Sequence, residues 1–482
     1  MESTKPHIAL LASPGIGHLI PMLELAKRLV SNQTFKVTVF VVSTDHASIA
    51  NTQLLQSPAA AAGSGDDGLL DVVLVPFVDV PDIVGPGDAM VEKLVATVLR
   101  SLPFIRTEIS KMEIPPAALV VDLFGTEALG IADEFNMLKL VLIASNAWFI
   151  AVMLCSPDID RKEIEEHVKN RTPLNIPGCK PLKFEDTFHV FSMDPNDPSY
   201  QGYIGTAIKM SLTDGILVNT WDELEPTSLK ALRHTKKVPI YPIGPLVRST
   251  GKSVPRNEII DWLDKQPGES VIYVSFGSGG TLSAQHVIEL AWGLELSQQR
   301  FLWVVRPPTE NDAAGTFFTL GNGTYTNPDY LPDGFLARTQ DRGLVVPMWA
   351  PQVQVLSHPS TGGFLTHCGW NSSMESIVHG VPMIAWPLYA EQKLNANMLT
   401  EDIGASIRVT TVESDGVVTR EEIRSMVRKI LVDHEGRNIR ARCKELKISA
   451  AKAIAEGGSS YNSLSQIAEV CIQHLKTESS RA

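Results

Sequence analysis

Short apolar runs alternate with helical patterns along the first half of the chain. Runs that are apolar at nearly every position, rather than at every second one, are typical of parallel strands buried on both faces. Segments with helical periodicity separate these runs, as in successive βαβ units. The pattern therefore predicts a doubly wound α/β domain. The runs occupy residues 7–12, 35–43, 71–77, 117–121, 138–144 and 215–219.

The same alternation restarts in the second half and predicts another parallel α/β unit. Thr419, followed three residues later by Glu422, has the spacing of a capping box and predicts the start of a late helix. The expected fold class is α/β, with two Rossmann-like doubly wound domains facing a central cleft. Strands are expected at 271–276, 301–305, 343–347, 362–366 and 381–386, and a helix is expected at 283–297.

Irregular segments interrupt this pattern. Residues 238–256 contain four prolines and two glycines without a helical or strand period, a composition that suits a linker. We expect segment 57–68 to be a mobile surface loop and segment 307–330 to be a flexible flap. The expected division is a domain at 1–245, a linker at 246–256, a domain at 257–460, and a C-terminal helix at 461–482 that packs back on the first domain.

Length and composition narrow the class of protein. A chain of 482 residues is too long for one core, and its net charge of -12 argues against nucleic acid as a partner. Its five cysteines are scattered and form no CxxC pair, so a reducing compartment is simpler than a disulfide framework. It has no apolar run of about 18 residues and no signal-peptide pattern. We expect a cytoplasmic monomer without membrane insertion.

Two loops of the second half have the chemistry of a phosphate site. The first, at 275–281 (SFGSGGT), lies between a predicted strand and a predicted helix, where small residues let backbone N–H groups approach an anion. An ordinary turn explains this loop equally well, because it is neither a GxGxxG fingerprint nor a Walker loop. The second, at 367–373 (HCGWNSS), adds side-chain donors at the start of another predicted helix.

The segment from Trp349 to Gln392 gathers further ligand-binding groups around the second loop. Trp349 and Trp370 offer flat apolar faces for a base or a sugar ring. Glu375, Glu391 and Gln392 can accept hydrogen bonds from hydroxyl groups. For any one of these residues, a place in the core or on a solvated face is an even alternative. That alternative does not explain so many hydroxyl- and phosphate-binding groups within 44 residues.

This 44-residue segment resembles, nearly position for position, the signature box of the plant family 1 UDP-glycosyltransferases. The resemblance extends to the Gly-x-Gly-His loop at 15–18 and the SFGS loop at 275–278, so it covers the whole chain. The strings SPGIGHLIP, VVDLFG and WPLYAEQ are most similar to the branch that acts on small phenols, monolignols and related acceptors such as indoxyl. The resemblance implies a GT-B fold and glucosyl transfer from UDP-glucose as co-substrate, with no bound cofactor and no metal.

In this family the box binds the sugar nucleotide, and the resemblance assigns a role to each matching residue. Gln392 implies glucose, because a histidine at that position goes mostly with galactose. Glu391 stands where the family usually has aspartate, which keeps the carboxylate on a longer arm. The uracil and ribose would be held by Trp349, the Ala350 backbone, Gln352 and Glu375, the diphosphate by Ser278, His367, Asn371 and Ser372, and the sugar by Trp370, Glu391 and Gln392.

The resemblance also assigns His18 and Asp122 to the catalytic pair. His18 lies at the start of the first predicted helix and Asp122 ends the strand at 117–121, so both are expected at one edge of the sheet. His18 would take the proton of the acceptor hydroxyl, and Asp122 would orient the imidazole. The first turn of a helix disfavours an imidazolium, which would keep His18 uncharged. Attack opposite the leaving UDP gives a β-D-glucoside. Without Asp122 and the box, local capping or packing would be the simpler explanation of His18.

The acceptor site is the least defined part of the sequence. Phe124 and Trp148 follow two strands of the first domain and are candidates for its walls, although core positions explain both equally well. Loops near 80–90 and 185–200 are further candidates. The stretch 158–160 (DID) has the DxD spacing of metal-dependent transferases, but its context predicts a helix cap instead.

Two other functions are consistent with a nucleotide site between two α/β domains. One is a nucleotide-dependent oxidoreductase, which the absence of a GxGxxG with an acidic residue about 20 positions later argues against. The other is a non-catalytic sugar-nucleotide binding protein. The presence of both His18 and Asp122 argues against that alternative.

Overall fold

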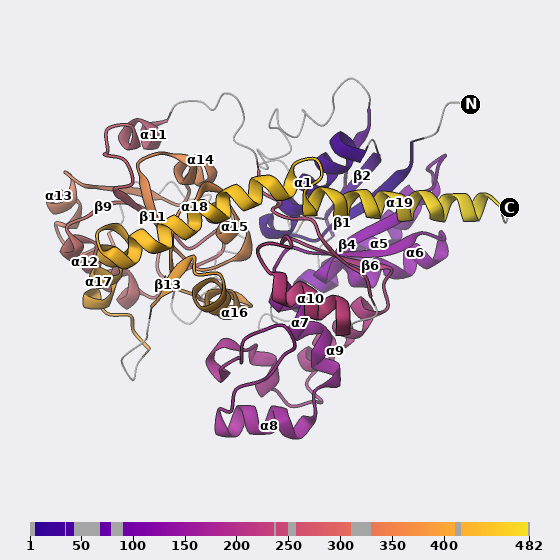
Figure 1. Ribbon diagram of the computed structural model, residues 1–482, viewed down its shortest axis with the longest axis horizontal. Coiled ribbons are helices and arrows are strands. Elements are labelled where there is room, and N and C mark those ends of the chain that lie inside the picture. Colours follow the sequence, from indigo (N-terminus) through magenta and orange to yellow (C-terminus); the bar gives the residue numbers. More distant parts are fainter. Residues whose placement is uncertain are drawn as a thin grey trace. The chain divides into compact units, whose positions relative to one another are not determined.

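The chain divides into two compact units, and each contains one parallel sheet (Figure 1). Unit 1 comprises Met1–Phe184, His189–Val247 and Lys452–Ala482, and unit 2 comprises Glu185–Phe188 and Arg248–Ala451. The computed structural model describes residues 5–33, 35–42, 68–78, 90–235, 238–248, 257–309, 329–409 and 416–480. Most of the predicted loop at 57–68, linker at 246–256, flap at 307–330 and acceptor loop at 80–90 therefore lies outside the described residues.

The sheet of unit 1 has the strand order β3-β2-β1-β4-β5-β6-β7, and every pair is parallel. The order reverses between β1 and β4, and loops that follow such strands form the usual ligand site of doubly wound sheets. Strands β1 and β4 are buried along their whole lengths, as continuous apolar runs predict. The strands are β1 (His7–Ala12), β2 (Lys36–Val41), β3 (Leu70–Leu74), β4 (Ala118–Asp122), β5 (Leu138–Ile143), β6 (Gly215–Val218) and β7 (Ile240–Pro242).

The first residues of the segment 238–256, whose composition suggested a linker, include a strand instead, β7. Ile240–Pro242 pairs with β6 at the edge of the sheet, although the prolines around it suggested an irregular segment. Proline cannot donate to a strand ladder, so it is tolerated only where one side of the strand is unpaired. An edge strand meets that condition, and the linker composition therefore hid a short strand.

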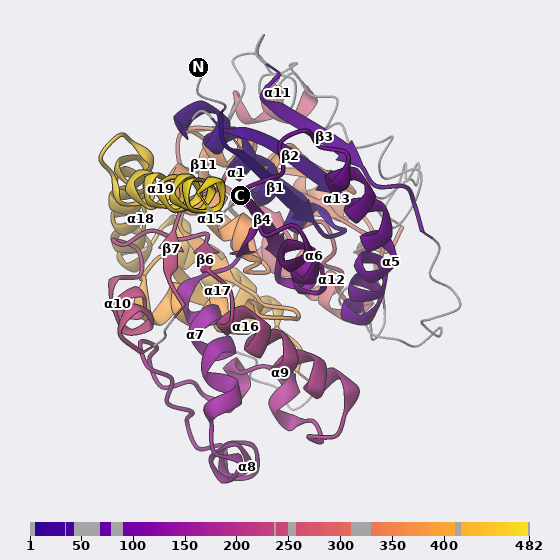
Figure 2. The same cartoon turned by 90° about the vertical axis from the view of Figure 1, so that its right-hand side faces the viewer.

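Helices cover both faces of the first sheet. Figure 2 shows α1 and α19 on one side of it and α5 and α6 on the other. Leu464, Ile467 and Cys471 of α19 are buried in the same apolar cluster as the face of α1 that contains Leu23 and Leu29. The C-terminal helix therefore contributes to the core of unit 1. The helices are α1 (Ile16–Gln33), α5 (Met90–Ser110), α6 (Leu129–Glu134), α7 (Ala147–Cys155), α8 (Arg161–Asn170), α9 (Pro198–Ser211), α10 (Pro226–Thr235) and α19 (Ser459–Ser479), with short turns η1 (Leu123–Ala128), η2 (Ser156–Asp158), η3 (Phe184–Asp186) and η4 (His189–Ser192).

The sheet of unit 2 has the order β10-β9-β8-β11-β12-β13 and is also entirely parallel. Its strands lie where apolar runs predict them, except for β13, whose three residues are too few to stand out from the sequence around them. The strands are β8 (Val271–Ser275), β9 (Arg300–Val305), β10 (Gly343–Pro347), β11 (Thr361–Thr366), β12 (Met383–Ala385) and β13 (Ser406–Arg408).

One helix of unit 2, α17, begins at the cap that the sequence predicted. The Thr419 hydroxyl accepts a hydrogen bond from the Glu422 amide at 3.3 Å, which confirms the predicted helix start. Among the described residues, no helix is both long and apolar enough to cross a membrane. The helices are α11 (Glu258–Leu263), α12 (Ala284–Ser297), α13 (Phe335–Thr339), α14 (Gln352–Ser357), α15 (Trp370–His379), α16 (Gln392–Asn397), the π-helical turn η5 (Met398–Asp402), α17 (Arg420–Leu431) and α18 (His434–Ile454).

Candidate active site

The loop between β1 and α1 places His18 beside Asp122 in unit 1. Gly15 has a φ of 108°, which a residue with a Cβ rarely adopts, and this turn brings the chain into α1. His18 lies in the first turn of that helix, and its Nδ1 is 3.5 Å from Asp122 Oδ2. Catalytic hydrogen bonds are often this long before substrates bind. The structure therefore brings together the two residues predicted to act as a pair.

Asp122 is held by an unusually complete set of donors. It ends β4, which neighbours β1, and it is 1% exposed. Its Oδ1 accepts from the Ser13 hydroxyl at 2.6 Å and from the Phe124 and Gly125 amides at 3.1 and 3.0 Å. Its Oδ2 accepts from the Ser13 amide at 2.9 Å and faces His18. Four donors thus fix the carboxylate in an orientation in which its Oδ2 faces Nδ1 of the His18 imidazole.

The two predicted acceptor residues have different surroundings. The Phe124 ring is half-buried and meets the His18 imidazole edge to face, with 5.0 Å between ring centroids. Trp148 is 0% exposed in α7, whose start is capped by Asn146 and by both carboxylate oxygens of Glu225. The structure therefore brings Phe124 to the predicted catalytic pair and places the Trp148 ring in the core of unit 1.

The two loops of unit 2 that were predicted to bind phosphate, 275–281 and 367–373, meet at the imidazole of His367. Gly277 has a φ of 75°, and a Cβ added there would lie 2.4 Å from His367 Cε1 and 2.5 Å from Nε2. A Cβ added at Gly369 would lie 2.4 Å from the same Nε2. Both positions thus need glycine because the ring fills the space that a side chain would take. Ser278 lies beside Gly277 in the first loop, so both loops that sequence reasoning assigned to the diphosphate meet at this ring.

The start of α15 provides backbone donors for an anion. Gly369 occupies the N-cap position, where it offers no side-chain hydrogen bond to the first turn. Helix starts leave amide N–H groups without partners inside the helix, and these groups favour negative charge. Asn371 and Ser372, both predicted diphosphate ligands, lie in this first turn. The amides and the two side chains can therefore bind one anionic group.

The predicted ribose ligands form a connected network. Gln352 Nε2 donates to Glu375 Oε2 at 2.7 Å and to the Ser372 hydroxyl at 2.9 Å. Burial raises the pKa of the Glu375 carboxyl, and the hydrogen bond from Gln352 opposes that shift. Beside this network, Trp349 is 64% exposed while Ala350 is buried. The Trp349 ring is therefore exposed and could stack on a flat ligand, and the Glu375 carboxylate of the network could accept hydrogen bonds from hydroxyl groups.

The predicted sugar ligands lie around the start of α16. Gln392 Oε1 accepts from the Leu388 and Tyr389 amides at 2.9 and 3.0 Å, so its NH₂ group is left to donate elsewhere. Glu391 Oε1 is 3.5 Å from Asn395 Nδ2. Trp370 is only 2% exposed, so little of its ring can contact a sugar. Gln392 and Glu391 therefore offer a donor and an acceptor side by side.

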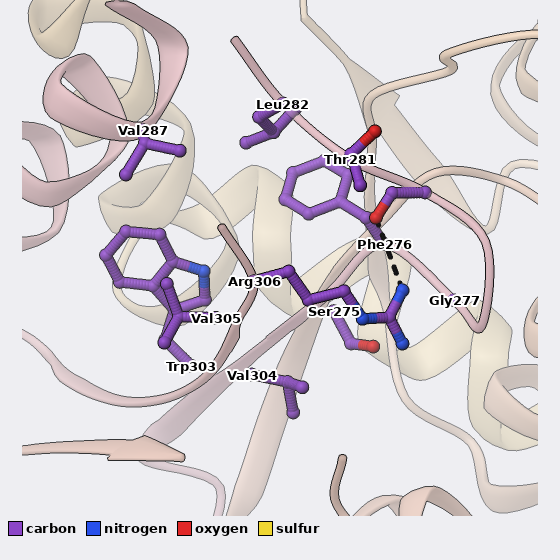
Figure 3. A pocket seen from close by; sticks show the side chains of 11 residues that line it. Ser275, Phe276, Gly277, Thr281, Leu282, Val287, Trp303, Val304, Val305 and Arg306 are labelled. Carbon is purple, nitrogen blue, oxygen red and sulfur yellow. Dashed lines mark hydrogen bonds between the residues drawn. The ribbon is translucent and has the colours of Figure 1, made fainter. Parts of the chain in front are cut away.

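A small cavity of about 20 Å³ lies behind the first phosphate loop (Figure 3). It is bounded by Ser275–Gly277 and Gly280–Leu282 of this loop, by Val287, by the last residues of β9 and by Arg306, which follows β9. Its volume is that of about one water molecule. The sequence reasoning did not identify Arg306 or Ser13 as site residues. Their only signal was position, since each directly follows a strand that borders a predicted site.

The helix cap predicted at the DxD stretch is confirmed at Asp160. Asp160 is the N-cap of α8, and its side chain accepts from the Lys162 amide at 2.9 Å. Within the described ranges, no group of three or more His, Cys, Asp and Glu side chains is placed to hold a metal ion. The Asp160 carboxylate thus serves as the N-cap of α8.

The burial of His367 predicts a loss of stability in acid. Burial, and secondarily the charge of Arg306, lowers the pKa of His367 from 6.5 to about 3. Between these values the unfolded chain binds a proton that the folded chain does not, so the unfolding free energy falls as pH falls. We expect His367→Gln to reduce this slope by about 1 kcal/mol per pH unit. Urea unfolding at pH 7 and pH 5 measures it, and an unchanged slope would contradict a neutral buried imidazole.

The whole chain is similar to known UDP-sugar-dependent transferases. The family described as "UDP-glucoronosyl and UDP-glucosyl transferase" matches residues 243–439. UDP-glycosyltransferase 72E1 of Arabidopsis thaliana is 48% identical over 478 residues, which are 97% of each chain. The hydroquinone glucosyltransferase of Rauvolfia serpentina is 44% identical over 474 residues, covering 97% of this chain and 98% of that protein.

Solved structures give the same result for the fold. The crystal structure of TcCGT1 in complex with UDP has a TM-score of 0.90 at 44% identity and covers 98% of this chain and 100% of that one. The α/β class with two Rossmann-like units is thereby confirmed, and the oxidoreductase alternative is excluded. The chain belongs to the plant family 1 UDP-glycosyltransferases, GT-B enzymes that transfer a sugar from a UDP-sugar.

Proposed function

We propose that this enzyme transfers glucose from UDP-glucose to the hydroxyl of a small aromatic acceptor, with inversion, to give a β-D-glucoside. The observation that carries the proposal is the His18–Asp122 pair, in which Asp122 is fixed by four other hydrogen bonds. Nδ1 of His18 faces the carboxylate, so Nε2 is the nitrogen that takes the acceptor proton. The carboxylate then stabilises the imidazolium that forms.

The donor side of the proposal rests on the groups gathered in unit 2. Trp349 would stack on uracil, and Gln352 and Glu375 would bind the ribose. As the glycosidic bond breaks, negative charge collects on the UDP diphosphate, where the α15 amides, Ser278 and His367 can stabilise it. This charge stabilisation comes from protein groups, so we propose that the reaction needs no metal.

The acceptor class is proposed from similarity and from Phe124. A hydroquinone glucosyltransferase shares 44% of its residues with this chain, and phenols combine a flat apolar ring with an acidic hydroxyl. The Phe124 ring next to His18 is suited to contact such a ring. Phenols, monolignols and indoxyl all satisfy this description, and Gln392 favours glucose as the transferred sugar.

A panel of acceptors tests the proposed function. The chain is incubated with UDP-glucose and, in turn, hydroquinone, coniferyl alcohol, indoxyl and an aliphatic alcohol, and products are identified by mass spectrometry and by the anomeric coupling in NMR spectra. We expect β-glucosides of the aromatic acceptors and equal rates with and without a chelator. α-Glucosides, or a preference for the aliphatic alcohol, would contradict the proposal. UDP release that needs an acceptor would exclude a non-catalytic binding protein.

A further inference from the structure

Arg306 connects the two loops of unit 2 that the proposed function assigns to UDP. It follows β9, and its Nη1 donates to the Gly280 carbonyl at 3.3 Å, the bond drawn in Figure 3. Its Nε and Nη2 both donate to the Met348 carbonyl at 3.3 Å. One planar guanidinium thus spans two carbonyls from segments almost 70 residues apart in the chain.

Each carbonyl belongs to a loop that holds a different part of the nucleotide. Gly280 lies in the loop at 275–281, which contains Ser278, a proposed diphosphate ligand. Met348 directly precedes Trp349 and Ala350, the proposed uracil ligands. The distance between these loops must match the length of UDP. The planar guanidinium of Arg306, which donates to a carbonyl of each loop, can fix that distance.

The backbone at Met348 shows why that loop needs a tether. Its φ is 65°, a left-handed conformation that costs a non-glycine residue free energy. The Met348 amide donates to the Val305 carbonyl at 2.9 Å, and its own carbonyl accepts from Arg306. Contacts on both sides of the residue therefore hold the strained peptide from which Trp349 projects.

The charge of Arg306 adds a second effect. The guanidinium lies in a largely buried position, which lowers its pKa, and it borders the cavity behind the first phosphate loop. It is near enough to His367 to lower the pKa of that imidazole further. A positive charge in such surroundings is weakly screened and attracts a diphosphate.

We propose that Arg306 is a positioning residue for the UDP-sugar, which fixes the spacing of the diphosphate loop and the uracil loop and places a positive charge behind the diphosphate. The inference rests on the donor site of the proposed function. It predicts that Arg306 affects nucleotide binding through both halves of the ligand, the base and the phosphates.

Binding of uridine and of UDP separates these two contributions. Uridine lacks the phosphates and reports on the uracil loop alone, whereas UDP reports on loop spacing and charge together. We expect Arg306→Gln to raise the dissociation constant of UDP by roughly 10-fold or more and that of uridine by less. Arg306→Lys keeps the charge but cannot span both carbonyls, so it should recover UDP binding in part and leave uridine binding weak. In turnover, the KM for UDP-glucose should rise while the KM for the acceptor stays unchanged.

Arg440 supplies a matched control. It is also in unit 2, and its Nη2 bridges the Gly362 and Ile430 carbonyls at 2.9 and 3.2 Å, away from the proposed ligands. Arg440→Gln should lower the melting temperature without changing either dissociation constant. Unchanged UDP binding in Arg306→Gln, or equal weakening in Arg440→Gln, would overturn the proposal. Calorimetry of UDP binding needs no acceptor, so it tests the role of Arg306 even if the acceptor panel fails. The same measurement on Trp349→Ala tests separately whether UDP binds at the proposed donor site.

Discussion

The His18→Ala variant is expected to lose roughly 10²- to 10⁴-fold in kcat/KM for a phenolic acceptor while binding UDP as tightly as the unmodified chain. The reason is that a neutral phenol is a poor nucleophile, and the Ser13 hydroxyl, which also contacts Asp122, donates its proton to that carboxylate and is not a base. Removing the imidazole leaves the donor ligands of unit 2 in place. The loss should therefore appear in turnover and be absent from UDP binding measured by calorimetry.

The acidity of the acceptor makes this test specific for proton transfer. A phenol that is already ionised at the assay pH does not need a base, so His18→Ala should lose far less activity with a nitrophenol than with hydroquinone. His474 of α19 is a matched control in the same unit, because its Nε2 lies 2.7 Å from the Asn136 carbonyl oxygen and not beside Asp122. His474→Ala should retain full turnover with both acceptors. An equal loss with both phenols, or a loss of UDP binding, would contradict the role of His18 as base.

The fold could be predicted closely because its strands are continuous apolar runs. Such runs stand out where a strand has five or six residues, as β1 and β8 do, since no amphipathic helix has that pattern. Two strands of three residues escaped the prediction. β13 is too short to show a pattern, and the prolines of β7 indicate an irregular segment unless the pairing partner is known.

The candidate site could be predicted where side chains carry the chemistry. His18, Asp122 and the residues from Trp349 to Gln392 have recognisable donors, acceptors and rings, and the structure places His18 Nδ1 3.5 Å from Asp122 Oδ2. Ser13 and Arg306 were not predicted as site residues, because only their contacts with residues distant in the sequence connect them to the site. A serine after a strand is unremarkable in a sequence, and only the parallel pairing of β1 with β4 shows that its hydroxyl reaches Asp122.

Burial is the property that sequence patterns conveyed least well. Trp148 was a candidate for the acceptor wall with a core position as an equal alternative, and Trp370 was expected to contact the sugar; both residues are almost completely buried. Trp349, in contrast, is largely exposed. An aromatic residue near a site can either contact the ligand or pack in the core, and the sequence of the segment does not distinguish these two positions. The packing between helices and sheet decides which, and that depends on residues distant in the sequence.

Two features of the structure require glycine at position 277, its backbone conformation and its contact with the His367 ring, and substitutions can distinguish their effects. Its φ of 75° disfavours any residue with a Cβ by about 1–2 kcal/mol, and a Cβ would also come within 2.4 Å of the His367 ring. The ring has little freedom to withdraw, because Gly369 also lies against its Nε2 and the imidazole is buried. A Cβ at position 277 would therefore displace the His367 ring, itself a proposed diphosphate ligand, or shift its own loop, including the adjacent Ser278.

Gly277→Ala should therefore raise the dissociation constant of UDP by roughly 10- to 100-fold, since forced displacement in a packed site costs about 1–3 kcal/mol. Gly457→Ala is the matched control, because Gly457 has a φ of 78° and nothing lies within 4 Å of an added Cβ. Both variants should lose stability to backbone strain, measured as a lower melting temperature, but only Gly277→Ala should lose UDP affinity, measured by calorimetry. If the two variants bound UDP equally well, the contact between loop 275–281 and His367 would be irrelevant to the nucleotide, and the diphosphate would have to bind elsewhere in unit 2.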